Sequence, residues 1–169
     1  PCIWREGDVF YSLSGRITQA RHGHGMDIEF GGHDVAYLFR SRDLEHWEYR
    51  GPFYDAGRFA RPGEDCAVPD FFPLGGKHVL LFAAHSYGGQ YYTGAYADER
   101  FVPEAHARLN FSGYGTDLGR LVTAGDLMAP ISWLDGAGRR IIIAWVTEGR
   151  AWEVQQAAGW AGVMTLPRV

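Results

Sequence analysis

Residues 72–82 read FPLGGKHVLLF, an aromatic residue followed by a glycine turn and a short apolar run. Adjacent glycines of this kind form tight hairpin turns, and Val, Leu and Phe in a run of about five residues are typical of a buried strand. The segment therefore predicts an antiparallel hairpin whose second strand, His78–Ala83, lies inside the molecule.

The same order of aromatic residue, glycine-containing turn and apolar strand recurs on both sides of this segment. It begins at Trp4, before the apolar run Val9–Leu13, and again at Trp133, before the run Ile141–Val146. The three aromatic residues are about sixty residues apart, so each unit has room for about four short strands. Four-stranded units repeated in series are typical of β-propeller blades.

A second hairpin is predicted in each of the first two units. Apolar runs at Val35–Phe39 and Tyr91–Tyr96 supply the first strands of hairpins over Tyr37–Tyr49 and Tyr91–Phe101. The best helix candidate, Trp152–Ala158, is short and ends at a glycine. We therefore predict an all-β chain of roughly three blades, with a small β-sandwich as the alternative interpretation.

Composition limits the class of protein. The 169 residues are 46% hydrophobic and 21% charged with a formal net charge of −4, which is typical of a globular domain and not of a disordered chain. No apolar run approaches the ~20 residues that span a bilayer, and positive charge is not clustered. We expect neither a membrane segment nor a nucleic-acid partner. Cys2 and Cys66 lie far apart and predict no disulfide framework.

Four stretches together resemble glycoside hydrolase family 32, the β-fructosidases. They are the segment PDFFPL at 69–74, the hairpin YYTGAY at 91–96 with FVPE at 101–104, the strand GRRIIIAW at 138–145 and the segment GWAGVMTLPR at 159–168. The sequence SRDL at 41–44, with Trp47, also matches a blade pattern of that family. Each motif is short, but all occur in order along nearly the whole chain.

The resemblance implies a five-bladed propeller with a central funnel that binds a terminal fructosyl residue of sucrose or a fructan. Residues 1–169 are then part of the catalytic propeller, with the N-terminal blades and a C-terminal β-sandwich outside the chain. The family is retaining and uses an aspartate nucleophile, a glutamate acid and a further aspartate, without cofactor or metal. The nucleophile's Asn-Asp-Pro segment is absent here, and Pro1-Cys2-Ile3-Trp4 resembles the end of the Arg-Asp-Pro motif of the further aspartate. We therefore expect the chain alone to be inactive.

The acid of the family is a glutamate that precedes a Cys-Pro-Asp segment. Here residues 63–70 read GEDCAVPD, and two alignments are open. Alignment on Pro69-Asp70 puts the acid position on Ala67, which carries no proton. Alignment on the order Glu-x-Cys makes Glu64 the acid, and relatives with Gly-Glu-Asp before this segment favour Glu64 or Asp65. We take Glu64 as the predicted acid; the alternative is an ordinary charged turn.

Further residues are predicted to line the sugar site or to orient its groups. His85 follows a strand after which family members carry an acidic residue that touches fructosyl hydroxyls, and an imidazole can hydrogen-bond a sugar or a carboxyl group. Glu148 follows the strand Ile141–Val146, where relatives also have an acidic residue. The other predicted contacts are Asp65, Cys66 and Asp70. The structural alternatives are a polar strand end for His85 and a turn cap for Asp70.

A metal site is not expected. The candidate ligands His22, His24, Asp27, His33 and Asp34 have poor spacing for a metal, and a glycine-rich loop explains this segment at least as well. Most tryptophans are assigned to packing between blades. Trp152, outside the repeat, is the one predicted at the rim of the funnel.

Two other functions stay open. A non-catalytic carbohydrate-binding propeller would explain the absence of a glutamate at position 67. A propeller glycosidase for arabinosyl or xylosyl linkages shares the blade plan, although the segment 159–168 argues against it. The favoured interpretation gives a fructose-containing saccharide as partner, together with missing N-terminal blades of the same polypeptide.

Overall fold

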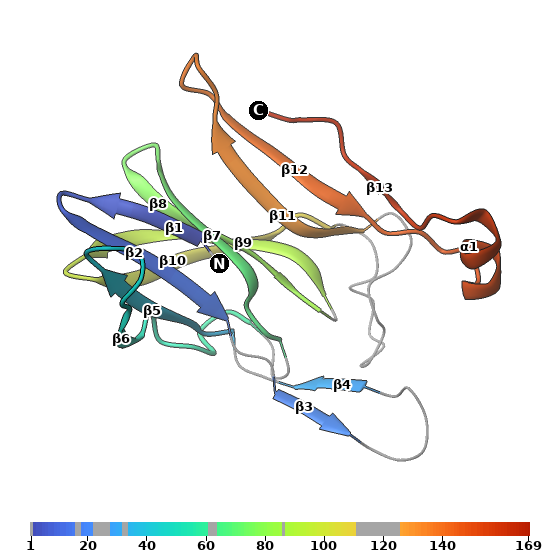
Figure 1. Ribbon diagram of the computed structural model, residues 1–169, viewed down its shortest axis with the longest axis horizontal. Helices are drawn as coiled ribbons and strands as arrows, with labels where there is room; N and C mark the ends of the chain where they lie inside the picture. The colour runs from blue at the N-terminus through green and yellow to red at the C-terminus, as the bar shows by residue number, and fades with distance from the viewer. Residues whose placement is uncertain are drawn as a thin grey trace.

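The computed structural model describes residues 2–15, 18–21, 28–31, 34–60, 64–85, 87–110 and 126–169, which form thirteen strands and one helix (Figure 1). The strands are β1 Cys2–Glu6, β2 Val9–Gly15, β3 Thr18–Arg21, β4 Ile28–Gly31, β5 Ala36–Ser41, β6 Glu48–Pro52, β7 Ala67–Leu74, β8 Lys77–Ala84, β9 Gly88–Ala97, β10 Arg100–Arg108, β11 Leu127–Leu134, β12 Arg140–Val146 and β13 Val163–Met164, and the helix is α1 Trp152–Ala158. No helix within these ranges is long and apolar enough to cross a membrane.

Most strands belong to three antiparallel sheets that follow the order of the chain. The sheets have the orders β1-β2-β5-β6, β10-β9-β8-β7 and β11-β12-β13, and a separate hairpin pairs β3 with β4. The all-β prediction is confirmed, as are the second hairpins of the first two sheets and the short helix Trp152–Ala158. The sequence does not predict the hairpin β3–β4, because its strands TQAR and IEFG carry few apolar residues.

The repeated aromatic residues take the same place in the three sheets. Trp4, Phe72 and Trp133 each lie on the first strand of a sheet, β1, β7 or β11. Their partners across the first hairpin are Tyr11, Val79 and Ile141. The sequence repeat therefore reflects the first hairpin of each sheet.

The turn between β7 and β8 shows why the motif contains two glycines. Leu74 pairs with Lys77, so Gly75 and Gly76 form a two-residue loop with φ angles of 58° and 80°. Positive φ at both positions matches the twist of the two strands, and glycine adopts it without a steric penalty. The glycine pair thus sets the register of the second sheet.

The first and second sheets pack through a shared aromatic core. Phe53 and Phe71 meet edge to face, with ring centroids 4.8 Å apart, and the ring of Trp4 lies 5.3 Å from that of Phe71. Leu80 and Phe101 are fully buried in the same cluster. Aromatic side chains bury large apolar areas, so this cluster accounts for much of the adhesion between the two sheets. The packing role predicted for tryptophans holds for Trp4.

The third sheet packs on the opposite face of the second. Asp70 Oδ2 accepts hydrogen bonds from the backbone nitrogen and the hydroxyl of Ser132 on β11, at 2.8 and 2.5 Å. The Arg140 guanidinium lies 4.1 Å from the centre of the Phe72 ring. Sheets stacked in series are the arrangement of propeller blades, whereas a sandwich consists of two facing sheets. The alternative of a small β-sandwich is therefore wrong.

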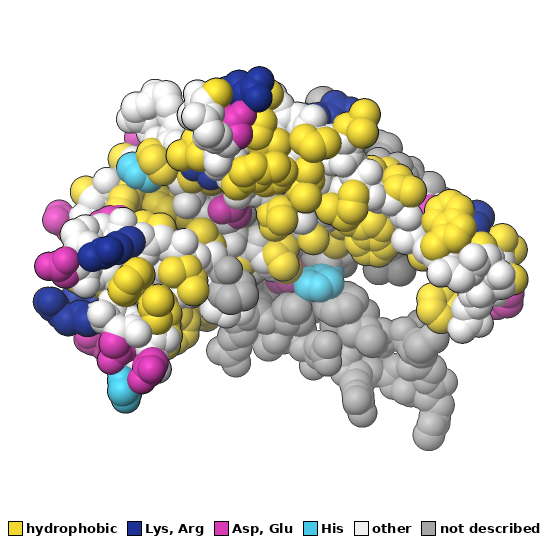
Figure 2. Space-filling view, turned by 45° about the horizontal axis from the view of Figure 1, so that its top comes forward, with side chains coloured by type: hydrophobic (Ala, Val, Ile, Leu, Met, Phe, Trp, Pro, Cys, Tyr) yellow, Lys and Arg dark blue, Asp and Glu magenta, His cyan; other side chains and the backbone are white. Residues whose placement is uncertain are grey.

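The third sheet exposes a broad apolar area. In Figure 2 hydrophobic side chains gather over the part of the molecule that contains β11, β12 and β13. Ile131, Trp133 and Trp145 are 48%, 40% and 41% exposed. Large exposed apolar patches mark interaction surfaces in folded proteins. The third sheet thus presents a face suited to the packing of a further blade.

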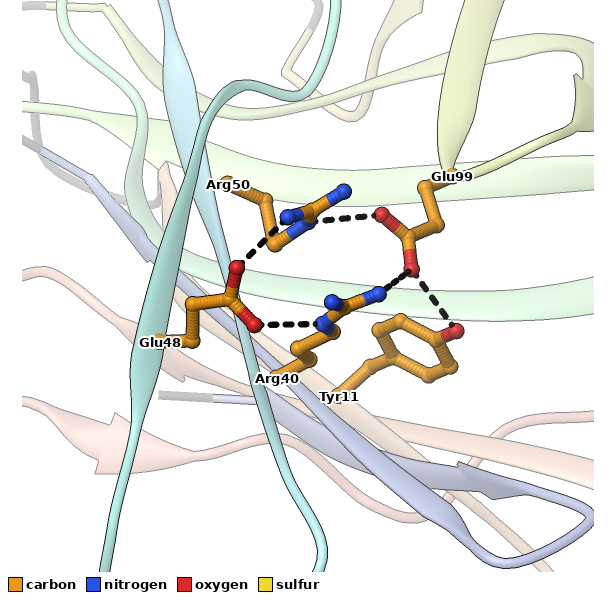
Figure 3. Close-up of polar contacts among 5 residues, drawn as sticks. All are labelled: Tyr11, Arg40, Glu48, Arg50 and Glu99. Carbon is orange, nitrogen blue, oxygen red and sulfur yellow. Dashed lines mark hydrogen bonds and ion pairs between the residues drawn. The ribbon is translucent and has the colours of Figure 1, made fainter.

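A cluster of ion pairs ties the first sheet to the outer hairpin of the second (Figure 3). Glu99, in the turn between β9 and β10, accepts hydrogen bonds from Arg50 Nε at 2.9 Å, the Tyr11 hydroxyl at 3.1 Å and Arg40 Nη1 at 3.2 Å. Glu48 pairs with both arginines. Burial opposes the ionisation of Glu99, but the donors outweigh it and hold the pKa of Glu99 below its ordinary value.

Replacement of Glu99 by Gln is expected to lower the free energy of unfolding by about 1–2 kcal/mol at neutral pH, because three donors lose a charged acceptor. A lowered folded pKa means that this stabilisation is complete above the unfolded pKa and is lost as the pH falls through the folded value. Urea unfolding at neutral and acid pH measures it. The difference between wild type and Glu99→Gln should shrink in acid, and a difference independent of pH would contradict the assignment. Glu104→Gln, which removes the exposed pair with Lys77, is the control with a smaller effect.

Candidate functional site

The strands that open the three sheets lie next to one another. β1, β7 and β11 are edge strands of their sheets, and β7 contacts both β1 and β11. Strands in this position surround the central channel of a propeller. Because the strands of each sheet are antiparallel, the start of β7, the end of β8 and the start of β9 lie at one end of the sheet. Side chains there can face one mouth of the channel.

Glu64 lies just before β7 and its side chain is fully buried. One carboxylate oxygen pairs with the guanidinium of Arg108, at the end of β10, and the other accepts a hydrogen bond from Nε2 of Gln90 on β9 at 3.1 Å. An unpaired buried carboxylate costs several kcal/mol, so Arg108 is what stabilises Glu64 in this position. These two contacts join the segment before β7 to β9 and β10 of the second sheet.

Gln90 extends this network to a histidine. Its Oε1 lies 2.8 Å from Nε2 of His106 on β10. Burial lowers the pKa of His106, and the nearby Arg108 adds to the effect. The neutral ring can donate its Nε2 proton to the amide oxygen of Gln90, which leaves the amide nitrogen to donate to Glu64. The predicted acid thus sits in a buried, connected polar network.

Asp65 and His85 form a second pair at the same end of the sheet. Oδ1 of Asp65 accepts the backbone N–H of His85, and Oδ2 lies 2.8 Å from the ring Nδ1. The side chain of Asp65 is 1% exposed and that of His85 is 31% exposed. One carboxyl group thus holds both the backbone and the ring of His85. Asp65 therefore orients the imidazole, and His85 is the member of the pair that reaches the surface.

Ala67, the alternative acid position, begins β7 and pairs with Ala83. The register shifts between Ala67 and Asp70, and Val68 has a φ of 44°, which is rare for a β-branched residue. Irregularities of this kind occur next to active sites, where they redirect side chains.

Cys66 lies in the core between the first two sheets and is 1% exposed. Burial raises the pKa of its thiol. The end of β2 approaches it closely, since a Cβ placed on Gly15 would lie 1.6 Å from the Cys66 carbonyl oxygen. The position is one of packing, and the predicted contact of Cys66 with a substrate stays a prediction.

Asp70 and Glu148 lie in different surroundings. Asp70 bridges the second and third sheets through Ser132, and its Oδ1 is 3.8 Å from Sγ of Cys2. Glu148, after β12, is paired with Arg150, which lowers the pKa of Glu148 and also stacks 3.9 Å from the ring of Trp160. Of the six predicted residues, the structure thus pairs Asp65 with His85. Glu64 and Cys66 adjoin Asp65 in the sequence but lie in a separate polar network and in the core, and Asp70 and Glu148 lie elsewhere.

Most of the weighed metal ligands, His22, His24, Asp27 and His33, lie outside the described residues. The buried Asp34 accepts hydrogen bonds from the Tyr92 hydroxyl at 2.6 Å and from the backbone nitrogen of Gly57 at 2.7 Å. Across the described parts of the chain, no group of three His, Cys, Asp or Glu residues could hold a metal ion.

Trp152, the residue predicted at the rim of the funnel, lies on α1 and is 62% exposed. That exposure leaves its indole accessible, and its place at the rim stays a prediction.

The sequence interpretation missed Arg108, Gln90 and His106. A signal was present: residues 106–108 read HAR, and side chains two apart on a strand share a face. Two basic residues on one face of a strand indicate an acidic partner across the sheet. Its identity could not be found locally, because Arg108 and Glu64 are 44 residues apart in the chain.

Comparison with known proteins adds a family assignment. The model described as the glycosyl hydrolases family 32 N-terminal domain matches residues 23–169. The chain is similar to a sucrose-6-phosphate hydrolase of Vibrio alginolyticus, with 28% identity over 99% of this chain and 33% of that protein. It is also similar in structure to a β-fructofuranosidase of Bombyx mori, with a TM-score of 0.68, 22% identity and coverage of 98% of this chain and 33% of the other. The chain therefore spans about a third of the length of the relatives it matches.

The fold is shared more widely than the family. An endo-arabinase of Bacteroides thetaiotaomicron superposes with a TM-score of 0.55 at 14% identity, over 87% of this chain and 44% of the other. The family 32 structures are five-bladed propellers, which confirms the prediction that this chain is part of one. Since the family model covers most of the sequence, the chain belongs to glycosyl hydrolase family 32, as part of its N-terminal domain.

Proposed function

We propose that these residues, joined to the remaining blades of a longer polypeptide, form a glycosidase that hydrolyses terminal β-fructosyl linkages in sucrose or a fructan. The observation that carries this proposal is the group Glu64, Asp65 and His85 at the start of β7, the strand that opens the second sheet. The names of similar proteins, a sucrose-6-phosphate hydrolase and a fructan 6-exohydrolase of Triticum aestivum, support a fructose-containing saccharide as substrate.

The chemistry needs groups from two parts of the polypeptide. Hydrolysis with retention takes a carboxylate that attacks the anomeric carbon and an acid that protonates the leaving oxygen, about 5–5.5 Å apart. We assign the nucleophile, and the aspartate that stabilises the transition state, to blades outside this chain. The residues at the start of β7 supply the acid side of the site. For Glu64 to be the proton donor, its carboxyl group would have to be released from Arg108 and take up a proton.

A non-catalytic carbohydrate-binding propeller is the second candidate. Ala67 cannot donate a proton, and the predicted acid Glu64 is buried and paired. These two observations fit a propeller that binds a sugar in its central funnel but has no residue that can donate a proton to the glycosidic oxygen. The two candidates differ in turnover, since both bind a saccharide and only the first cleaves it.

A fructose-release assay on the longer polypeptide separates them. We expect release of fructose from at least one of sucrose, sucrose 6-phosphate, inulin and levan, with Glu64→Gln assayed beside the wild type. If Glu64 is the proton donor, kcat falls by roughly 10²–10⁴-fold in this variant. An unchanged kcat would assign the acid role elsewhere. Saccharide binding in a calorimeter without any turnover would contradict the glycosidase and favour the binding module.

A further inference from the structure

We infer that the protein carries a second carbohydrate site, a pocket between the first and second sheets that takes a neutral saccharide. The pocket has a volume of about 450 Å³ and is lined by side chains from β1, β7, β8 and β9. That volume lies within the range of about 300–1,000 Å³ that is typical of small-molecule sites. The residues that carry the inference are Trp4, Arg5, Glu6, Phe71, His78 and Tyr96.

The pocket lies far from the proposed fructosyl site. It is formed where β1 and β7 end and β8 begins, whereas Asp65 and His85 lie at the start of β7 and just after the end of β8. His78 and His85 are seven residues apart along β8 and the residue that follows it. At about 3.3 Å per residue of extended strand, this separation is roughly 23 Å. A ligand in this pocket therefore does not occupy the place where hydrolysis is proposed.

Aromatic rings in contact with one another form the apolar wall of the pocket. The ring of Trp4 lies 5.3 Å from that of Phe71 and 6.4 Å from that of Tyr96. His78 stacks on Phe71 with ring centroids 5.2 Å apart, and its other neighbour, Tyr96, also lies at 5.2 Å. Trp4, His78 and Tyr96 are only half-buried. Rings fixed by mutual contact offer a preformed apolar surface to the C–H face of a sugar.

The polar groups of the pocket suit a ligand that both donates and accepts hydrogen bonds. Glu6 is exposed, and its Oε1 accepts a hydrogen bond from Nε1 of Trp4 at 2.7 Å. This bond orients the carboxylate and leaves Oε2 as an acceptor for a ligand. Among the residues that the structure describes, none forms a hydrogen bond with the ring nitrogens of His78. A neutral imidazole offers one donor and one acceptor.

The charges at the pocket favour a neutral ligand over an ion. Arg5 and Glu6 carry opposite charges, and both line the pocket. A cation is repelled by Arg5 and an anion by Glu6, so neither sign of charge gains from both residues. The hydroxyl groups of a sugar can donate to a carboxylate and accept from an imidazole, and the ring of the sugar presents apolar C–H groups to aromatic side chains. A neutral saccharide therefore matches the whole lining.

The test follows ligand binding at position 4 of the longer polypeptide. 5-Fluorotryptophan is introduced at that position, because Trp4 lines the pocket and is hydrogen-bonded to Glu6. Glucose, fructose and maltose are each titrated while the fluorine resonance is recorded, and we expect at least one of them to move it to saturation. Glu6→Gln removes a charged acceptor and should raise the Kd by about tenfold or more. His78→Phe keeps an aromatic ring but loses both nitrogens, and should raise the Kd by roughly 3–10-fold.

Two further measurements make this result specific. His46, in the turn between β5 and β6, is 86% exposed and lies outside the pocket, so His46→Phe should leave the Kd unchanged. The kcat and KM for sucrose should be unchanged in Glu6→Gln and His78→Phe, because the pocket lies at the other end of the sheets. If His78→Phe does not fold, Glu6→Gln carries the test, since Glu6 is exposed and the amide oxygen of glutamine can still accept from Trp4.

Three results would overturn the inference. They are a resonance that none of the sugars moves, a Kd that Glu6→Gln leaves unchanged, and saturation by acetate or tetramethylammonium at a lower concentration than by every sugar, which would assign the pocket to an ion. The proposed function fails separately. A wild type that binds a sugar here and releases no fructose would refute the glycosidase and leave this site in place, whereas an active wild type with no change at position 4 would refute this site alone.

Discussion

The 169-residue chain on its own is expected to release no fructose from sucrose, sucrose 6-phosphate, inulin or levan. On the proposed function, its three sheets hold the acid side of the site, and the attacking carboxylate is assigned to blades outside the chain. Both carboxyl groups have to flank the scissile bond for the reaction to proceed with retention. The chain also spans only about a third of the length of its relatives, and its described residues form three of the sheets that a five-bladed propeller needs.

The measurement compares fructose release by this chain and by the longer polypeptide at equal concentration. We expect a signal equal to the buffer blank for the chain and clear turnover for the longer polypeptide. The exposed apolar face of the third sheet, which includes Trp133 and Trp145, is expected to make the chain alone self-associate, and light scattering checks this. Turnover by the chain alone would show that the nucleophile lies within these residues, contrary to the assignment made here.

Arg108→Met is expected to cause the largest loss of stability of any single change at the site. The side chain of Arg108 is 15% exposed and its partner Glu64 is fully buried, so the substitution leaves a buried carboxylate without its cation. Removal of one partner of a buried ion pair costs about 3–5 kcal/mol. Denaturant unfolding of the longer polypeptide measures the change.

Two further variants make that measurement specific. The double variant Arg108→Met with Glu64→Gln removes both charges, so it should recover much of the lost stability. Arg100→Met removes the exposed pair with Asp55, at 2.5 Å, and should cost less than about 1 kcal/mol. Equal losses for Arg108→Met and Arg100→Met would mean that the buried pair contributes no more than a surface one.

The hairpins could be predicted from sequence because their signals are local. Gly75 and Gly76 fix the turn, and the apolar runs on either side fix which face is buried. The turn register alone would have placed Asp65 one residue beyond His85, because the register shifts between Ala67 and Asp70. The contact of Asp65 with His85 depends on this irregularity, which the apolar pattern of the sequence does not indicate.

The remainder of the site could not be predicted in the same way. Glu64 meets Arg108 only because β10 folds back across β9, and such a contact has no short-range pattern in the chain. The sequence also did not indicate that these side chains are buried. Residues 63–65, GED, are typical of a charged turn, yet Glu64 and Asp65 are almost completely buried. Side chains of this kind are buried only where partners from other strands satisfy them, and those partners come from the fold.

The most direct test is a crystal structure of the longer polypeptide with fructose bound. We expect the fructose ring in a channel at the start of β7, on the side of the sheet where Glu64, Asp65 and His85 lie. Fructose bound away from the start of β7, or a closed ring in which Glu64, Asp65 and His85 lie on the outer wall, would contradict the assignment of this site.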